Sequence, residues 1–174
     1  MGWSLEHRSL QESQFIDSYF LAIGKALYLA TEFEGKCLYI LQLLTILQIY
    51  KRTKDASLSL SQTVKSRFLN KTITGLSKSS LVKKKHLDVL HQAREARNYI
   101  AHESGKIGPL FSVTPKEVRG YLKRLQGSID DLANGDNLVS TWIYEIENKE
   151  PAPSFQRLYP KMIRRWIFGK DDCT

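Results

Sequence analysis

Two arginines, an asparagine and a histidine stand close together in the stretch AREARNYIAHE, residues 93–103. Arginine is always charged and can donate two parallel hydrogen bonds to an anion, while an imidazole gains and loses a proton near neutral pH. Arg97 and His102 could therefore hold an anionic group and move a proton beside it. Asn98 could orient either the imidazole or the anion.

The spacing of these residues fits one face of a helix. At 3.6 residues per turn, the four polar positions fall on one side, and an apolar set falls on the opposite side. The polar set is Arg94, Arg97, Asn98 and His102, and the apolar set is Val89, Ala93, Ala96, Tyr99 and Ile100. We expect the polar face to turn away from its own bundle. An ordinary solvated helix face is the simpler interpretation of the same pattern.

The run Arg97-Asn98-Tyr99-Ile100-Ala101-His102 resembles the R-N-x-x-x-H signature of the HEPN superfamily, which lies near the C-terminal end of a long helix. The resemblance extends over residues 10–148. It implies a small all-helical domain and, in many members, endoribonuclease activity without a metal or other cofactor. Such members belong to toxin–antitoxin and other defence systems. Other members have lost catalysis and serve as RNA-binding or protein-interaction modules.

The chemistry that the resemblance implies suits these residue types. RNA cleavage without a metal requires activation of the ribose 2′-hydroxyl, protonation of the leaving 5′-oxygen and stabilisation of a phosphorane. His102 can be the base or the acid, and Arg97 can hold the phosphoryl oxygens. The expected products carry a 2′,3′-cyclic phosphate and a 5′-hydroxyl. Because one histidine cannot easily be acid and base together, we expect a homodimer that apposes two motif faces.

Several further residues are candidates for supporting roles. Arg94 could bind an adjacent phosphate, and it could equally be a solvent-facing residue. Lys85 in the run Lys83–Lys85 could steer RNA, although a lysine run is usually a solvated face. Glu34 resembles the acidic position that many HEPN domains carry on their first helix, and Glu32 is the alternative. HEPN toxins neutralised by nucleotide transfer have a tyrosine two residues after the histidine. Here that position is Ser104, so a different antitoxin or regulatory partner would be needed.

The first half of the chain predicts three helices. Helical apolar spacing runs from Gln11 to Arg52, as one long helix or two nearly collinear ones. Within it the segment Leu38–Ile49 is apolar over most of its circumference, as in a central helix or a subunit interface. A second helix should end near Gly75. Its expected buried stripe is Val64, Phe68 and Leu69. Ser79 or Ser80 should cap the third helix, which carries the motif and stops at Gly105.

The second half predicts two more helices. Thr114 as N-cap, Pro115 at the first position and Glu117 form a strong start signal. That helix should run to Ala133, where Asn134-Gly135-Asp136 either breaks or kinks it. A last helix opens at Pro160, and its apolar side is expected from the spacing of Met162, Ile163, Trp166 and Ile167. Stacking of a nucleotide on Trp166 beside Arg164 and Arg165 is the competing interpretation.

These elements predict an all-α, up-and-down bundle of four to five main helices in a single domain of residues 1–174. Its core would span residues 10–148, with a helical extension over 154–170. The 26 Lys and Arg against 18 Asp and Glu give a net charge of +8, which favours a polyanionic partner such as RNA. Two distant cysteines support neither a disulfide framework nor a metal site. With no apolar leader or membrane span expected, we predict a soluble cytoplasmic protein.

Overall fold

The computed structural model describes residues 14–54, 68–79, 82–106 and 114–169. Within these segments all regular structure is helical, which confirms the all-α prediction. The elements are α1 (Gln14–Thr53), α3 (Leu69–Leu76), α4 (Lys84–His102), α5 (Pro115–Asn148), the 3-10 helix η2 (Ser154–Leu158) and α6 (Tyr159–Phe168). None of the described helices is long and apolar enough to cross a membrane.

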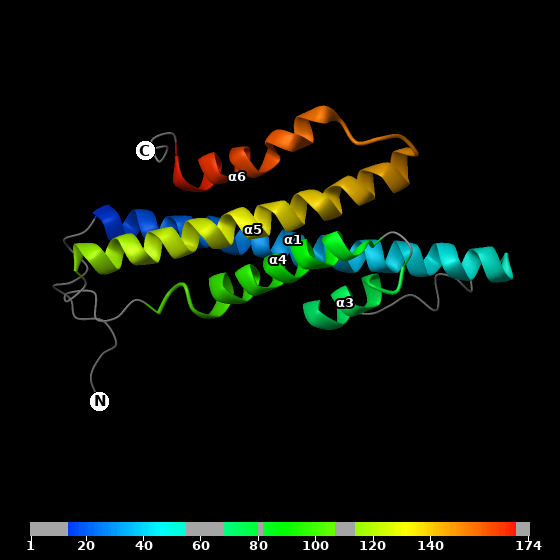
Figure 1. Ribbon diagram of the computed structural model, residues 1–174, viewed down its shortest axis with the longest axis horizontal. Coiled ribbons are helices and arrows are strands. Elements are labelled where there is room, and N and C mark those ends of the chain that lie inside the picture. The colour runs from blue at the N-terminus through cyan, green and yellow to red at the C-terminus, as the bar shows by residue number, and fades with distance from the viewer. Residues whose placement is uncertain (1–13, 55–67, 80–81, 107–113, 170–174) are drawn as a thin grey trace.

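The long helices α1 and α5 form the spine of the molecule and run side by side in the same direction (Figure 1). Helix α4 packs mainly on α5, and α6 packs on α5 and α1. Both α4 and α6 run opposite to the spine, on its two sides (Figure 1). The main helices therefore alternate in direction along the chain, as an up-and-down bundle requires.

The core forms where α1, α4 and α5 meet. Along α1, Tyr19, Ala26, Phe33 and Ile40 recur every seven residues, and all four are buried. Their partners on α5 are also fully enclosed, namely Leu125, Ile129, Leu132 and Val139. A seven-residue repeat keeps one seam of a helix facing a nearly parallel neighbour, which explains why α1 and α5 stay in contact over a long distance.

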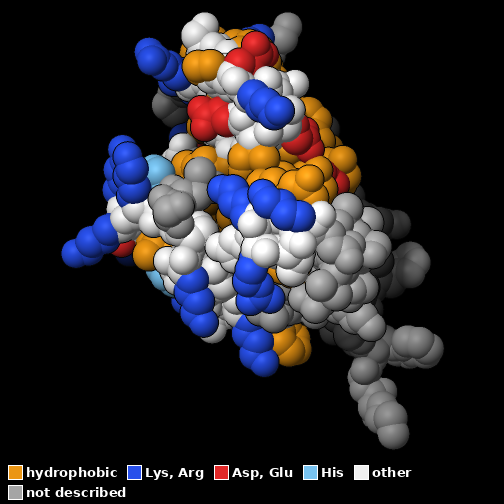
Figure 2. All heavy atoms as spheres, turned by 90° about the vertical axis from the view of Figure 1, so that its right-hand side faces the viewer, with side chains coloured by type: hydrophobic (Ala, Val, Ile, Leu, Met, Phe, Trp, Pro, Cys, Tyr) orange, Lys and Arg blue, Asp and Glu red, His pale blue; other side chains and the backbone are white. Residues whose placement is uncertain are grey.

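The last turns of α1 are less enclosed than its middle. Ile40 and Leu41 are buried, but Leu47 and Tyr50 are 40% and 46% exposed. Figure 2 looks onto this end and shows hydrophobic side chains at the surface among lysines and arginines. The segment Leu38–Ile49 is therefore a core helix in its first part only, and its later turns carry partly exposed apolar side chains.

Two sequence predictions around α3 and the start of α4 are wrong. Phe68 is 79% exposed, because it is the extended N-cap of α3 and its side chain leaves the stripe formed by Leu69 and Ile73. Ser79 does not cap α4, since its N–H is bonded to the Leu76 carbonyl and it closes the turn after α3. Lys83 is the N-cap of α4 instead. Val64 and Ser80 lie outside the described residues.

Helix α5 starts as predicted but does not stop where the sequence suggested. The Thr114 hydroxyl accepts a hydrogen bond from the Glu117 N–H, and the Glu117 carboxylate accepts one from the Thr114 N–H, so the capping box is confirmed. The helix then continues through Asn134-Gly135-Asp136 to Asn148. A Cβ at Gly135 would lie 2.3 Å from the Ala93 Cβ on α4. Glycine at this position therefore permits close helix packing, and the helix is not broken.

Asp136 ties three helices together. Its carboxylate is fully buried and accepts hydrogen bonds from Lys36 Nζ on α1, at 2.9 Å, and from the Tyr159 hydroxyl at the start of α6. A buried carboxylate needs such partners, because an unpaired charge is costly in a low-dielectric core. Burial raises the pKa of Tyr159, and the hydrogen bond to Asp136 raises it further, as the second-largest cause. The network holds α6 against the spine.

Helix α6 buries fewer apolar residues than its spacing predicted. It begins at Tyr159 with Pro160 in its first turn, as expected. Ile167 is buried and Ile163 is partly buried, but Met162 and Trp166 are 59% and 45% exposed. The short helix turns only one narrow stripe toward α1 and α5, so its remaining apolar side chains stay on the surface.

Candidate active site

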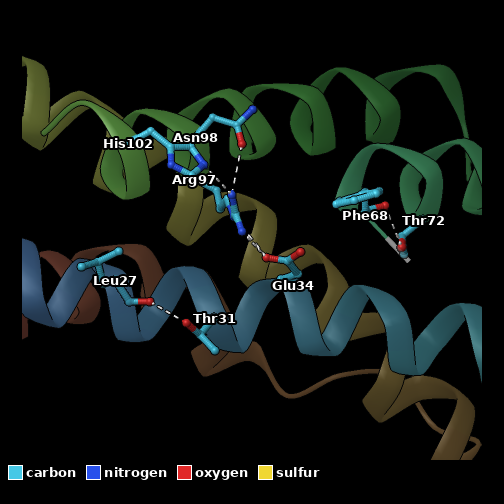
Figure 3. A network of polar contacts seen from close by, with 8 residues as sticks. All are labelled: Leu27, Thr31, Glu34, Phe68, Thr72, Arg97, Asn98 and His102. Carbon is cyan, nitrogen blue, oxygen red and sulfur yellow. Dashed lines mark hydrogen bonds and ion pairs between the residues drawn. The ribbon is translucent and has the colours of Figure 1, made fainter. Parts of the chain in front are cut away.

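The motif occupies the last turns of α4, as the sequence predicted. Tyr99 and Ile100 are buried on the inner side of this helix. Arg97 and Asn98 are partly buried, and His102 is exposed at the helix end. Arg97 Nη1 lies 3.3 Å from His102 Nε2 and 3.4 Å from Asn98 Oδ1 (Figure 3). The structure thus brings the three candidate catalytic side chains together.

Arg97 and His102 contact each other directly, through Nη1 of the guanidinium and Nε2 of the imidazole. A guanidinium can only donate hydrogen bonds, so a hydrogen bond between these two atoms requires His102 Nε2 to accept, which is the role of this nitrogen in the tautomer protonated on Nδ1. The nitrogen that carries the lone pair therefore lies directly beside a permanent cation. While this contact lasts the lone pair of Nε2 is occupied, and the nitrogen can take a proton only when Arg97 Nη1 moves away from it.

Glu34 fixes the orientation of Arg97. Its Oε2 atom accepts from Arg97 Nε at 3.1 Å and from Nη2 at 2.7 Å, across the gap between α1 and α4 (Figure 3). The two side chains are only 32% and 25% exposed, so solvent screens the pair less than it would at a fully open surface. Glu34 occupies the Nε side of the guanidinium and leaves the Nη1 end directed at His102. Glu32 is exposed and does not contact the motif.

This ion pair corrects the expectation that the motif face turns away from its own bundle. Arg97 reaches back to α1, and Arg94 hydrogen-bonds the side chain of Asn70 on α3 and pairs with Glu95. The polar face looks free when α4 is considered alone, whereas in the fold α1 and α3 pack along its edges. Long arginine side chains bridge to those neighbours, so only His102 stands clear at the tip.

The end of the motif helix is anchored from within the core. The Tyr19 hydroxyl on α1 donates to the Ser104 carbonyl at 3.1 Å, and the Ser104 hydroxyl donates to the Ile100 carbonyl at 2.7 Å. Ser104 is only 2% exposed. Burial raises the pKa of Tyr19, which keeps its hydroxyl protonated as a donor. These two bonds fix the chain immediately after His102 and limit how far the imidazole can move.

Lys85 lies far from the motif. It is exposed in the first turn of α4, about 18 Å along the helix axis from Arg97 at 1.5 Å per residue. Further lysines surround that end of the helix, at positions 78, 83 and 84, and all are exposed. Lys85 can steer a polyanion toward the molecule, but it cannot touch a group held by Arg97.

A groove between α4 and α5 adjoins the motif, and the sequence analysis missed it. Its volume is about 450 Å³. The polar side chains that line it include His91, Asn98, Arg124, Ser128 and Asp131. The spacing of His91, Glu95 and Asn98 places them on one helix face, which was the available signal. The α5 residues of the groove could not be predicted, because no pattern in the sequence of α5 indicates which of its faces packs against α4.

Elsewhere in the described segments, no group of three or more His, Cys, Asp or Glu side chains could hold a metal ion. Cys37 is buried, and burial raises the pKa of its thiol.

No family model matches the chain, and no match is found among curated proteins or solved structures.

Proposed function

We propose that this chain is a metal-independent endoribonuclease that resembles the HEPN nucleases and acts as a homodimer on single-stranded RNA. The observation that carries the proposal is the arrangement around Arg97. Glu34 holds one side of the guanidinium, and the other end contacts the lone-pair nitrogen of His102. An oriented cation and a proton acceptor thus share one exposed point at a helix end. We further propose that it acts in the cytoplasm as a defence effector or toxin.

The proposed reaction uses these atoms directly. Binding of the RNA phosphate draws Arg97 Nη1 away from His102 Nε2, which frees the lone pair of that nitrogen. His102 Nε2 then takes the proton of the ribose 2′-hydroxyl, and the 2′-oxygen attacks the adjacent phosphorus. The Nη1 and Nη2 end of Arg97 stabilises the charge that develops on the phosphoryl oxygens. The bond from phosphorus to the 5′-oxygen then breaks, and a protonated imidazole supplies the proton to the leaving oxygen. The products carry a 2′,3′-cyclic phosphate and a 5′-hydroxyl.

A second copy of the chain would supply the second imidazole. An uncharged stripe on α1 lies beside the motif and is open to solvent, and Leu27 and Thr31 of this stripe are on the helix that carries Glu34 (Figure 3). Phe20 and Leu27 in this stripe are 42% and 39% exposed. Gly24 between them has no neighbour within 4 Å of a Cβ position, so another helix could approach closely. Apposing two such stripes would bring two motif ends toward one cleft.

A specific observation also favours a second candidate function, a non-catalytic RNA-binding or protein-interaction module. Arg97 donates two hydrogen bonds to Glu34, and Arg94 donates one to Asn70. Much of the hydrogen-bonding capacity of these two arginines is therefore taken up by contacts within the chain. Ion pairs of this kind also hold helices together without any chemistry. Such a module would bind RNA or a partner protein and leave the RNA intact.

Control by nucleotide transfer to the position two residues after the histidine is not part of the proposal. Ser104 occupies that position, is buried, and has its hydroxyl bonded to the Ile100 carbonyl. A transferase could not reach it without unfolding the end of α4. If the protein is a toxin, an antitoxin or regulatory protein must act in another way.

Cleavage of labelled RNA in the presence of EDTA tests the proposal. We expect a bell-shaped pH profile and cyclic-phosphate products, and we expect His102→Ala to lower the rate at least 100-fold, the usual contribution of an acid–base group. His86→Gln is the matched control, since His86 lies on the same helix, about 24 Å along the axis, with its ring against Trp142. Circular dichroism must show both variants folded. Undiminished cleavage by His102→Ala would refute the catalytic assignment.

A further inference from the structure

Three carboxylates line the groove between α4 and α5, and among the described residues two of them are paired with arginines while the third, Asp131, is not. Glu95 pairs with Arg94, and Glu103 pairs with Arg124 at 2.9 Å. Asp131 is partly buried, and no other described side chain bonds or pairs with it. Burial raises the pKa of this carboxyl group. A partly desolvated carboxylate that faces a groove is an acceptor site for N–H donors.

Away from Asp131, the groove is lined by the side chains of Arg124 and Tyr99. The guanidinium of Arg124 lies over the ring of Tyr99, 4.2 Å from its centroid, and the Arg124 side chain is 62% exposed. The Tyr99 ring therefore covers one side of the Arg124 guanidinium, while more than half of this side chain stays exposed to solvent. Unpaired nucleobases stack on such planes. Arg124, Ser128 and Asp131 follow one another on α5 at spacings of four and three, so they line the same wall.

The groove is also continuous with the motif. Asn98 lines it and at the same time contacts Arg97 Nη1. From Asn98 the groove extends toward His91, two turns earlier on α4 and about 10 Å along the axis. A nucleotide next to a phosphate held at Arg97 would therefore have its base within reach of this groove.

We propose that this groove binds a guanine base of the RNA next to the phosphate at Arg97, with the Asp131 carboxylate accepting from the base. This inference rests on the proposed RNA-cleaving function. Guanine carries an N1–H and a 2-amino group side by side, which match the two oxygens of a carboxylate, whereas uracil offers a single N–H on that edge. Adenine and cytosine offer one amino group each. The groove therefore discriminates by the number of adjacent donors.

Binding measurements test this inference separately from cleavage. The probes are short oligouridines that carry one guanosine or one inosine, with every 2′-hydroxyl replaced by 2′-O-methyl so that they cannot be cut. Inosine lacks only the 2-amino group. We expect the wild-type protein to bind the guanosine probe roughly tenfold more tightly, the usual discrimination of a paired hydrogen-bond contact. Asp131→Asn should reduce that ratio below about twofold, and Asp88→Asn, an exposed carboxylate on α4 outside the groove, should preserve it.

The outcomes separate the two proposals. Equal binding of both probes by the wild-type protein, or a preference that survives in Asp131→Asn, would overturn the guanine site. A dimer that dissociates in Asp131→Asn while the base preference is unchanged would overturn it too, because the groove would then hold a cationic side chain of a second copy. A guanosine preference without cleavage of natural RNA would reject the nuclease and retain the base site. Cleavage without the preference would do the reverse.

Discussion

Gly135 offers the most direct test of how the helices are positioned. A Cβ at this residue would lie 2.3 Å from the Ala93 Cβ on α4 and 3.2 Å from the Phe33 ring on α1. Ordinary contact begins near 3.4 Å. Gly135→Ala must therefore push α4 and α5 apart locally by about 1 Å, since a Cβ cannot rotate out of the way and a packed core resists such displacement.

The expected cost follows from two opposing effects. Overpacking of this kind costs about 1–3 kcal/mol. Replacing glycine with alanine inside a helix returns about 0.5–1 kcal/mol. The net destabilisation should be about 1–2 kcal/mol, which for a chain of this size lowers the melting temperature by about 2 to 8 °C.

Thermal unfolding followed by circular dichroism measures the effect, and α5 supplies a matched control. Gly127 is exposed with nothing within 4 Å of a Cβ position, so Gly127→Ala should raise the melting temperature by a few degrees. Adding Ala93→Gly to Gly135→Ala should recover part of the loss, as a coupling of about 1 kcal/mol in a double-mutant cycle. If Gly135→Ala stabilises the protein as Gly127→Ala does, the close contact of α4 with α5 is refuted.

Three further predictions test the site and the network that supports it. Arg97→Lys keeps the charge but loses the planar contacts to both neighbours, so kcat/KM for RNA should fall about 100-fold, and an unchanged value would demote Arg97 to a structural residue. Lys36→Met leaves the buried Asp136 carboxylate without its cation and should cost about 3 kcal/mol in urea unfolding, whereas a loss below about 0.5 kcal/mol would exclude a structural role for the pair. Hydrogen bonds from Thr114 lower the pKa of Glu117, so the stability that this cap contributes is complete above the ordinary glutamate pKa and is lost as pH falls through the lower folded value. Glu117→Gln should remove this acid dependence, and identical acid unfolding curves would contradict it.

The local features were predictable because neighbouring residues determine them. The Thr114 capping box, the length of α1 and the end of the motif helix at His102 follow from caps, breakers and helical spacing. Glu34 was identified through the family resemblance, and the structure places it against Arg97. Whether that contact serves catalysis stays a prediction.

The errors occurred where a distant helix decides the outcome. Phe68 has the spacing of a core residue, but it lies at the N-cap of α3 and points outward. Gly135 has the composition of a break, yet it marks the point where α4 approaches α5. The polar face of α4 was expected to be free of its own bundle, although α1 and α3 reach it with Glu34 and Asn70.

By itself, the sequence determined the helical class, the start of α5 and the placement of Arg97, Asn98 and His102 on one helix end. These features follow from interactions between residues that lie within about one helical turn of each other in the sequence. Only the tertiary structure decided that Glu34 orients the guanidinium toward the imidazole, and that Asp131 lines a groove beside Asn98 with no ion-pair partner among the described residues. Those arrangements depend on how α1 and α5 pack against α4, and such long-range packing is set by the whole core at once.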